Sequence, residues 1–310
     1  SGRTDEMRRS IFLSFVLIAA LSLLLNVLVY VFIDPILALL RVPTDVIPLM
    51  KTYLLIIFAG IAATFLYNYC ASVLRAIGNA VVPLLFLAVS AVLNVALDLC
   101  FVIVLRLGVG GAAFATVLAQ FVSGIGILLY TLLRFPDLRP KKDDCRCSRK
   151  ALGRILNLSL MTCLQQSIMN FGILMIQGLV NSFGTVIMAA FAAAVKIDSF
   201  AYMPVQDFGN AFSTFVAQNF GAGKSDRIRR GMRSACCTSA VFSLVISLLV
   251  VLFAKPLMSI FIDPSETAII AAGVTYLRIE GACYLGIGTL FLLYGYYRAV
   301  NKPLMSVILT

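Results

Sequence analysis

The side chain with the clearest chemistry in this chain is Asp98, one of few ionisable residues inside its long apolar stretches. Asn94 lies four residues earlier, so in a helix the two side chains share a face and the Asn94 amide can hydrogen-bond the carboxyl group in either protonation state. An ionisable group at membrane depth costs at least about 2.5–3.5 kcal/mol, which makes it a functional candidate. We predict that Asp98 takes up and releases a proton. The alternative is that Asn94 and Asp98 only tie helices together.

Three further ionisable residues, Lys196, Asp198 and Glu280, lie within later apolar stretches. Lys196 and Asp198 are two residues apart, so in a helix they point in different directions and meet separate partners. Asp198 is predicted to pair with polar residues of the preceding helix, and Glu280 to bind a cation about two turns below the outer surface. Ion pairs or hydrogen bonds that only join helices are the alternative. The polar residues available to Asp198 are Gln165, Gln166 and Asn170.

The composition restricts the class of protein. Hydrophobic residues make up 61% of the 310 residues and charged residues 13%, and the mean hydropathy is +1.00. Soluble globular domains have about 45–50% apolar and about 25% charged residues, so an ordinary water-soluble enzyme is excluded. The chain has no His, which removes the commonest general base and metal ligand at neutral pH. We therefore expect a membrane protein without a metal or cofactor, in which most of the eight Cys residues are small packing residues.

The elements that hold the candidate residues are predicted to be membrane-spanning helices. A span needs about 20 apolar residues to cross about 30 Å of hydrocarbon. The apolar stretches are too long for the strands of a barrel, so they must be helices. The predicted fold class is all-α, a polytopic membrane helix bundle with eight complete spans and the start of a ninth at Leu304. The eight stretches cover residues 11–33, 47–74, 84–105, 111–133, 155–183, 186–220, 235–253 and 268–297.

The basic residues predict the orientation of these spans. Of the 25 Lys and Arg residues, 19 fall before the first span or in every second loop after it, four fall in the other loops or, as Lys51 does, at the adjoining start of a span, and two lie deep within helices. This excess marks the cytoplasmic side. The net charge of +11 then faces anionic lipid headgroups, and nucleic acid is not a predicted partner. Residues 1–135 are predicted to form a first lobe of four spans, 136–152 a basic cytoplasmic linker and 153–310 a second lobe.

An internal repeat relates the two lobes. The segment Gly-Arg-Thr-Asp-Glu-Met-Arg-Arg at 2–9 matches Gly-Lys-Ser-Asp-Arg-Ile-Arg-Arg at 223–230, at a numbering offset of 221. The Arg-Ala pair at 75–76 matches the pair at 298–299 at an offset of 223. Both copies leave the cytoplasmic side, so the repeat is parallel and each unit should contain six spans. We therefore expect this sequence to be the middle of a longer protein, lacking two spans at each end.

Several short motifs resemble one family of membrane proteins. They are Gln-Asn-Phe-Gly-Ala-Gly-Lys at 218–224, the turn Leu-Arg-Ala-Ile-Gly-Asn at 74–79 before Pro83, the run from Leu93 to Asp98, and Gly-Val-Gly-Gly-Ala-Ala at 108–113. In their order and repetition they resemble the MATE family, the multidrug and toxic compound extrusion transporters, over essentially the whole chain. The resemblance implies a two-lobed antiporter of twelve helices that exchanges protons or sodium ions for organic, often cationic, substrates.

The resemblance also implies site residues. In proton-coupled members of the family, an Asn and an Asp at this spacing form a proton-responsive network with a Thr on the next helix and an Asn on the preceding one. An Asp on the first span, which completes the network, falls outside this sequence. Sodium-coupled relatives carry acidic residues at positions near Met169 and Ile287, which are apolar here, so protons are favoured over sodium. The residues that match the network are Asn68, Asn94, Asp98 and Thr116.

The predicted function is export of organic, cationic or amphiphilic drugs or metabolites in exchange for protons, by a monomer in the plasma (inner) membrane that works by alternating access. A lipid-linked glycan flippase of the same superfamily is the alternative within transport, and its substrate would distinguish it. A membrane-embedded enzyme is disfavoured because the sequence has no His-Glu-x-x-His motif and no Ser/His pair. A receptor-like or structural bundle would show no exchange in reconstituted vesicles.

Overall fold

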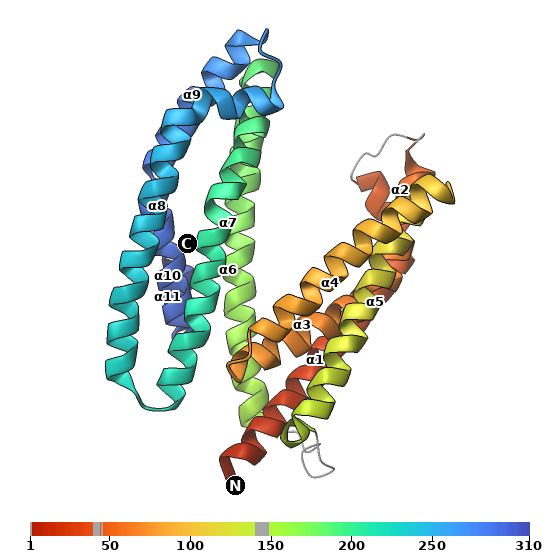
Figure 1. Cartoon of the computed structure of the whole chain (residues 1–310), viewed down its shortest axis with the longest axis vertical. Helices are drawn as coiled ribbons and strands as arrows, with labels where there is room; N and C mark the ends of the chain where they lie inside the picture. The colour runs from red at the N-terminus through yellow and green to blue at the C-terminus, as the bar shows by residue number, and fades with distance from the viewer. Residues whose placement is uncertain (1, 40–43, 45, 140–148) are drawn as a thin grey trace. The chain divides into compact units, whose positions relative to one another are not determined.

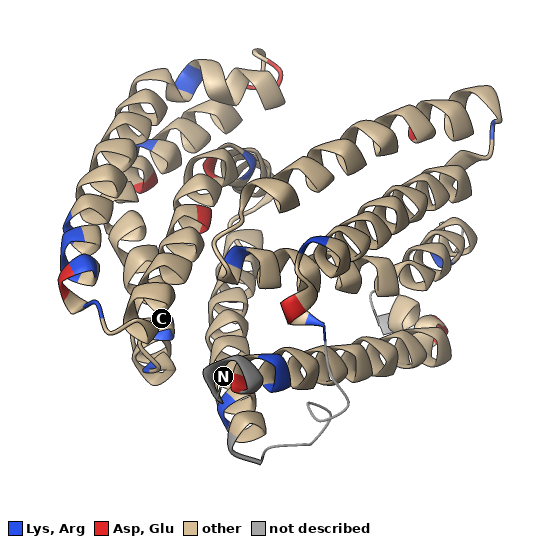
Figure 2. Cartoon of the chain, turned by 60° about the horizontal axis from the view of Figure 1, so that its bottom comes forward, with Lys and Arg blue, Asp and Glu red and all other residues tan. Residues whose placement is uncertain are grey.

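The computed structural model of the chain describes residues 2–39, 44, 46–139 and 149–310, and these residues are almost entirely helical. They form two units, Ser1–Ile155 and Leu156–Thr310 (Figure 1). Among the described residues, six helices and two bent helix pairs are long and apolar enough to cross a membrane, which gives up to eight spans. Figure 2 shows that long stretches of these helices carry no charged residue. The predicted all-α membrane bundle is therefore confirmed.

The first unit is built around α5 (Gly108–Arg134). This helix packs against α2 (Ile47–Ala59), α3 (Ile61–Ala76) and α4 (Val81–Asp98), and α1 (Gly2–Leu39) packs against α2 and α3. The buried face of α5 is mostly Gly, Ala and Ser, which lets neighbouring backbones approach closely. A Cβ on Gly124 would lie only 2.7 Å from the carbonyl oxygen of Ala63 in α3. The π-helix η1 (Leu99–Val104) follows α4, and the 3-10 helix η2 (Pro136–Leu138) follows α5.

The second unit is built around α7 (Thr185–Gly221), which follows α6 (Arg149–Asn181). α7 packs against α8 (Ser225–Phe261), α9 (Thr267–Ala282) and α10 (Tyr284–Ala299), and α11 (Pro303–Ile308) packs against α10. Figure 1 shows α7 and α8 as long antiparallel helices joined by a short turn. A polar contact between α7 and α10 accompanies their packing, because Arg298 donates a hydrogen bond from Nη2 to Oδ1 of Asn210, 2.9 Å away.

Several helices extend beyond the predicted apolar stretches. α1 begins at Gly2 rather than near residue 11, and α8 covers Ser225–Phe261 rather than 235–253. Hydropathy detects only the part of a helix that suits hydrocarbon, whereas backbone hydrogen bonding continues the helix into polar surroundings. The predicted spans 47–74 and 268–297 are each a bent pair, with angles of 43° between α2 and α3 and 50° between α9 and α10.

The bends and kinks confirm the internal repeat, unit by unit. The break between α2 and α3 falls at Gly60 and that between α9 and α10 at Cys283, which are equivalent positions at the offset of 223. One residue with non-helical dihedral angles interrupts each of α1 and α8: Phe32 (φ −108°, ψ 17°) and Phe253 (φ −100°, ψ 17°), which are equivalent at the offset of 221. A proline follows each by three positions, and a proline inside a helix removes one hydrogen bond and clashes with the preceding turn.

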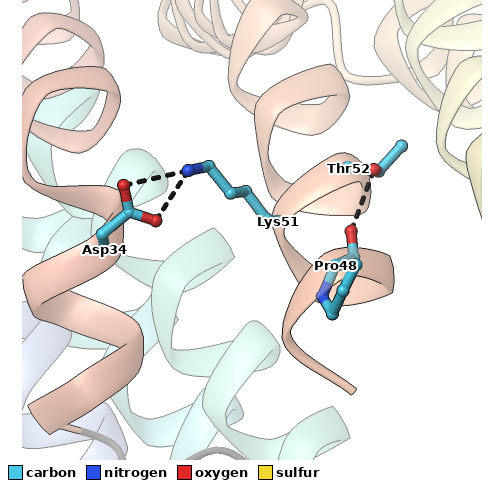
Figure 3. A network of polar contacts seen from close by, with 4 residues as sticks. All are labelled: Asp34, Pro48, Lys51 and Thr52. Carbon is cyan, nitrogen blue, oxygen red and sulfur yellow. Dashed lines mark hydrogen bonds and ion pairs between the residues drawn. The ribbon is translucent and has the colours of Figure 1, made fainter. Parts of the chain in front are cut away.

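One polar contact distinguishes the first unit from the second. Lys51 of α2 donates from Nζ to both carboxylate oxygens of Asp34 in α1, at 2.6 and 2.9 Å (Figure 3). The repeat places Lys255 at the position equivalent to Asp34, so the side chain at this position is positive in the second unit and negative in the first. The predicted linker 136–152 lies in part outside the described residues, which end at residue 139 and resume at 149.

The contact between α7 and α10 gives a first testable prediction. A Cβ on Gly295 would lie 2.4 Å from the carbonyl oxygen of Gly209, closer than real Cβ contacts, so the two helices would have to separate. Gly295→Ala is expected to lower the free energy of unfolding by about 1–3 kcal/mol, measured by thermal unfolding of the purified protein. Gly286→Ala, in the same helix with no atom within 4 Å of its Cβ, is the matched control. Equal stability of the two variants would contradict the close packing.

Candidate functional site

In the first unit, the structure brings Asn94 and Thr116 together. Asn94 lies on α4 and Thr116 on α5, and the Asn94 amide donates from Nδ2 to Oγ1 of Thr116 over 3.3 Å. The Thr116 hydroxyl in turn donates to the carbonyl oxygen of Ala112, 3.0 Å away. Further along the same interface, the Ser90 hydroxyl donates to the carbonyl oxygen of Ala119 at 3.1 Å. The packing of α4 against α5 therefore positions two of the four predicted first-lobe residues.

Asp98 lies where the regular helix ends. It is the last residue of α4, and the π-helix η1 begins at the next residue. Its Oδ1 atom is buried and has no hydrogen-bond partner among the residues that the structure describes. The π-helix has wider turns than an α-helix, as shown by the hydrogen bond of 2.9 Å from the Leu105 amide to the carbonyl oxygen of Cys100. Short π-helical segments are frequent at functional sites, so this geometry keeps Asp98 a candidate.

Asn68 lies one turn after Thr64, the residue of α3 whose side chain forms a hydrogen bond to α5. Its Nδ2 atom donates to the carbonyl oxygen of Thr64 within the same helix at 2.9 Å, and its side chain is exposed. The hydroxyl that joins α3 to α5 is that of Thr64, which donates to Oε1 of Gln120 at 2.6 Å. Thr64 and Gln120 are polar residues at this interface that the sequence reasoning missed. No hydrogen bond among the described residues joins Asn68 to Asn94, Asp98 or Thr116.

Asn68 instead lines a groove between α1 and α3. The groove has a volume of about 560 Å³, and five further polar side chains line it: Ser14, Ser22, Thr64, Tyr69 and Ser72. At the repeat offset of 223, Asn68 corresponds to Phe291 and Ser72 to Gly295 of α10. In the second unit this face of α10 packs against Gly209 of α7. The groove therefore corresponds to a helix-packing face in the second unit, which weakens the assignment of Asn68 to a proton network.

In the second unit, four titratable side chains from three helices meet. Asp198 of α7 lies within interaction distance of Glu280 of α9 and Tyr284 of α10, and Tyr276 of α9 faces Glu280. Asp198 is 8% exposed and Tyr284 is 4% exposed. Three of the oxygen atoms are buried without a hydrogen-bond partner among the described residues: Oδ1 of Asp198, Oε2 of Glu280 and the hydroxyl of Tyr284. We call Asp198, Tyr276, Glu280 and Tyr284 the acidic cluster.

The structure does not bring Asp198 into hydrogen-bond contact with its predicted partners. Gln165 is buried, Gln166 and Asn170 are exposed, and none of them forms a hydrogen bond to Asp198 in the described part of the chain. The reason is that α7 packs closely against α9 and α10, which carry the rest of the acidic cluster. The sequence analysis did not identify Tyr276. A signal for it was available, because Tyr276 and the predicted Glu280 are four residues apart and therefore share one face of a helix.

Lys196 and Asp198 point in different directions, as predicted. Asp198 is buried in the acidic cluster, whereas Lys196 is exposed and its Nζ atom lies 5.9 Å from the centre of the Phe261 ring. Within the described residues, no group of three His, Cys, Asp or Glu side chains could hold a metal ion. Both units contain buried carboxyl oxygen atoms, and such atoms can bind a proton or a small cation.

Comparison with known proteins identifies the family. A model of the MatE family matches residues 1–100 and 158–310. The probable multidrug resistance protein YpnP of Bacillus subtilis is 33% identical over 294 residues, which cover 95% of this chain and 65% of that protein. The FAD transporter of Shewanella oneidensis is 24% identical over 307 residues, 97% of this chain and 66% of that protein. The chain thus spans slightly less than two thirds of the length of these relatives.

Solved structures agree with this assignment. A mutant of the Vibrio cholerae MATE transporter VcmN superposes with a TM-score of 0.91 at 25% identity, covering 99% of this chain and 69% of that one. The bent form of VcmN gives a TM-score of 0.89 at 27% identity with the same coverage. These relatives are transporters and not enzymes, and they share the two-lobed helical bundle. The chain belongs to the MatE family, the MATE transporters, and is a multi-pass protein of the plasma membrane.

Proposed function

We propose that the protein exports organic compounds, cationic or amphiphilic, in exchange for protons by alternating access. Family membership supports transport, and the name of the Bacillus subtilis relative, a probable multidrug resistance protein, supports drug-like cargo. The Shewanella oneidensis relative is named for FAD, so related chains serve chemically different cargo. The choice of an organic cation for this chain rests on its own buried carboxyl oxygen atoms.

The observation that carries the proposal is a set of buried carboxyl oxygens without hydrogen-bond partners in the described residues. They belong to Asp98 in the first unit and to Asp198 and Glu280 in the second. An ionised carboxylate that is buried and unpaired is strongly destabilised, so it recruits a proton or a cation. A proton and an organic cation neutralise the same negative charge. Binding of one therefore disfavours binding of the other, which is the requirement for exchange.

The location of Asp98 connects proton binding to a change of shape. It joins an α-helix to a π-helix, and a π-helical segment differs from an α-helix in the hydrogen bonds of only a few residues. A proton on Asp98 changes the charge at this junction and so favours one arrangement of the segment over the other. A ligand that binds two conformations unequally shifts the population between them, which is the basis of alternating access.

Sodium is the second candidate for the coupling ion. The acidic cluster places two carboxyl groups and two phenol oxygens together, and oxygen atoms are suitable ligands for a small hard cation. Against sodium stand the apolar residues Met169 and Ile287, near the positions where the resemblance to sodium-coupled relatives implies acidic residues. We therefore propose protons as the coupling ion, and the test includes sodium as a separate condition.

The test is transport of ethidium, an organic cation, by the protein reconstituted into lipid vesicles. We expect an imposed pH gradient to drive ethidium movement against its concentration gradient, and a sodium gradient at constant pH to drive none. Vesicles without protein and vesicles treated with a protonophore are the controls. Movement driven only by sodium would reject proton coupling, and no movement under either gradient would reject the assignment of organic cations as cargo.

A further inference from the structure

An apolar groove between α7 and α8 takes no part in the proposed transport site. Its volume is about 420 Å³, and all of its lining residues are apolar, among them Ile197, Phe200, Ile246, Phe253 and Phe261. Along α8 it extends from Ile246 to Phe261, a length of about 22 Å at 1.5 Å per residue. The kink of α8 at Phe253 lies in its wall. A cavity of this shape and composition suits a long hydrocarbon chain.

A positive charge lies at the rim of this groove. The Nζ atom of Lys196 is 5.9 Å from the centre of the Phe261 ring, which lines the groove. Phe200, one helical turn after Lys196 on the same face of α7, lines it too. No ion pair of Lys196 is present in the described part of the chain, and the acid closest in sequence, Asp198, is buried in the acidic cluster. The ammonium group is therefore available to an anion.

The rim also lies at a polar boundary. Phe261 is the last residue of α8, and the exposed loop that follows contains Asp263, whose Oδ1 accepts hydrogen bonds from the amide and the hydroxyl of Ser265 at 2.9 and 2.7 Å. Lys196 itself lies eleven residues inside α7, and its long side chain extends its ammonium group toward Phe261 at this end of α8, as lysine side chains do in reaching from apolar surroundings to a polar boundary. The groove thus has an apolar body and a cationic mouth near the surface, which matches the chemistry of an anionic lipid.

We propose that this groove binds an anionic phospholipid, with one acyl chain between α7 and α8 and the phosphate against Lys196. The apolar walls accept the chain by burying hydrocarbon, and the ammonium group selects the headgroup charge. Lys196 would repel an organic cation, so the groove is separate from the path of the proposed cargo. The lipid site stands independently of the proposed transport, because it rests on residues that the transport proposal does not use.

None of the other described helices fills the groove. The helices that pack against α8 are α7, α9 and α10, and its counterpart α1 packs against α2 and α3, the counterparts of α9 and α10. The remaining helices of the first unit, α4 and α5, pack mainly against each other and against α2 and α3. Within the described residues, only α7 and α8 line the groove, and no other described helix covers its opening.

The test compares lipid retention by the purified protein, measured by native mass spectrometry after addition of phosphatidylglycerol or phosphatidylcholine with identical acyl chains. We expect the wild type to retain phosphatidylglycerol about fivefold better, the effect of one lysine at an anionic surface. Lys196→Gln should remove this preference and leave the retention of phosphatidylcholine unchanged. Lys196→Arg should keep the preference. Lys255→Gln is the matched control, because Lys255 is an exposed lysine of α8 that does not line the groove.

A second pair of variants tests the groove itself. Leu249 lines it and Leu252 does not, although both are exposed residues of α8. Leu249→Trp should lower retention of both lipids, and Leu252→Trp should lower neither, which keeps the proposal testable if Lys196→Gln does not fold. Equal phosphatidylglycerol retention by Lys196→Gln and Lys255→Gln would overturn the proposal. Retention of dodecyl sulfate without phosphatidylglycerol would also overturn it, because the occupant would then be a single-chain anionic amphiphile.

Discussion

Asp98→Asn is expected to lower proton-driven ethidium export by at least about fivefold, the lower end of the usual range of coupling free energies. Asn keeps the size of the side chain but cannot bind or release a proton. Because Oδ1 of Asp98 has no hydrogen-bond partner among the described residues, the substitution removes the ionisable group without removing a hydrogen bond at that atom. The measurement is the initial rate of ethidium movement into vesicles energised by a pH gradient.

The matched control for this variant is Asp137→Asn. Asp137 is an exposed acid of the same unit, in η2 after α5, and the variant should export at the rate of the wild type. Thermal unfolding of both purified variants shows whether either substitution alters the fold. If correctly folded Asp98→Asn exports as fast as Asp137→Asn under the pH gradient, Asp98 has no part in coupling.

Within the acidic cluster, Asp198→Asn and Glu280→Gln are each expected to lower export by at least about fivefold. Asp198 is buried, Glu280 is half-buried and the two carboxyl groups lie within interaction distance, so under the proposed function they bind the exchanged ion as a unit. Residues that act as a unit give non-additive effects. The double variant should therefore export about as fast as the slower single variant, measured in the same vesicle assay.

Glu266→Gln serves as the control for the cluster, since Glu266 is an exposed acid directly before α9. Its export rate should equal that of the wild type. Effects of Asp198→Asn and Glu280→Gln that simply multiply in the double variant would show that the two carboxyl groups act separately. Wild-type rates for both single variants would restrict coupling to the first unit.

The fold could be predicted from the sequence because hydrocarbon imposes a simple rule on the backbone. Long apolar stretches must be helices in lipid, and the two offsets of the sequence repeat reappear in the kinks at Phe32 and Phe253 and in the breaks at Gly60 and Cys283. The helix ends were less accurate, because the polar turns of α1 and α8 lie outside the apolar part that hydropathy detects. The breaks themselves were not predicted, since Cys283 carries no local signal for one.

The candidate site was only partly predictable, because the sequence gives the face of a helix but not its neighbour. The spacing of Asn94 and Asp98 predicted a shared face, but the π-helix that begins after Asp98 has no sequence signature. Asp198 and Glu280 were each proposed alone, and their meeting depends on the packing of α7 against α9. The same limit explains why the predicted partners of Asp198 do not contact it and why the hydrogen bond between Thr64 and Gln120 was not foreseen.

The central claim is that a proton and an organic cation compete for the buried carboxyl groups, and proton release measures this directly. Ethidium is added to the purified protein in a weakly buffered solution near neutral pH, and a pH indicator records the protons set free. We predict that the wild type releases protons as ethidium binds, and that the variant Asp98→Asn, Asp198→Asn, Glu280→Gln releases none. Ethidium binding to the wild type without proton release, or equal release by the triple variant, would contradict the account.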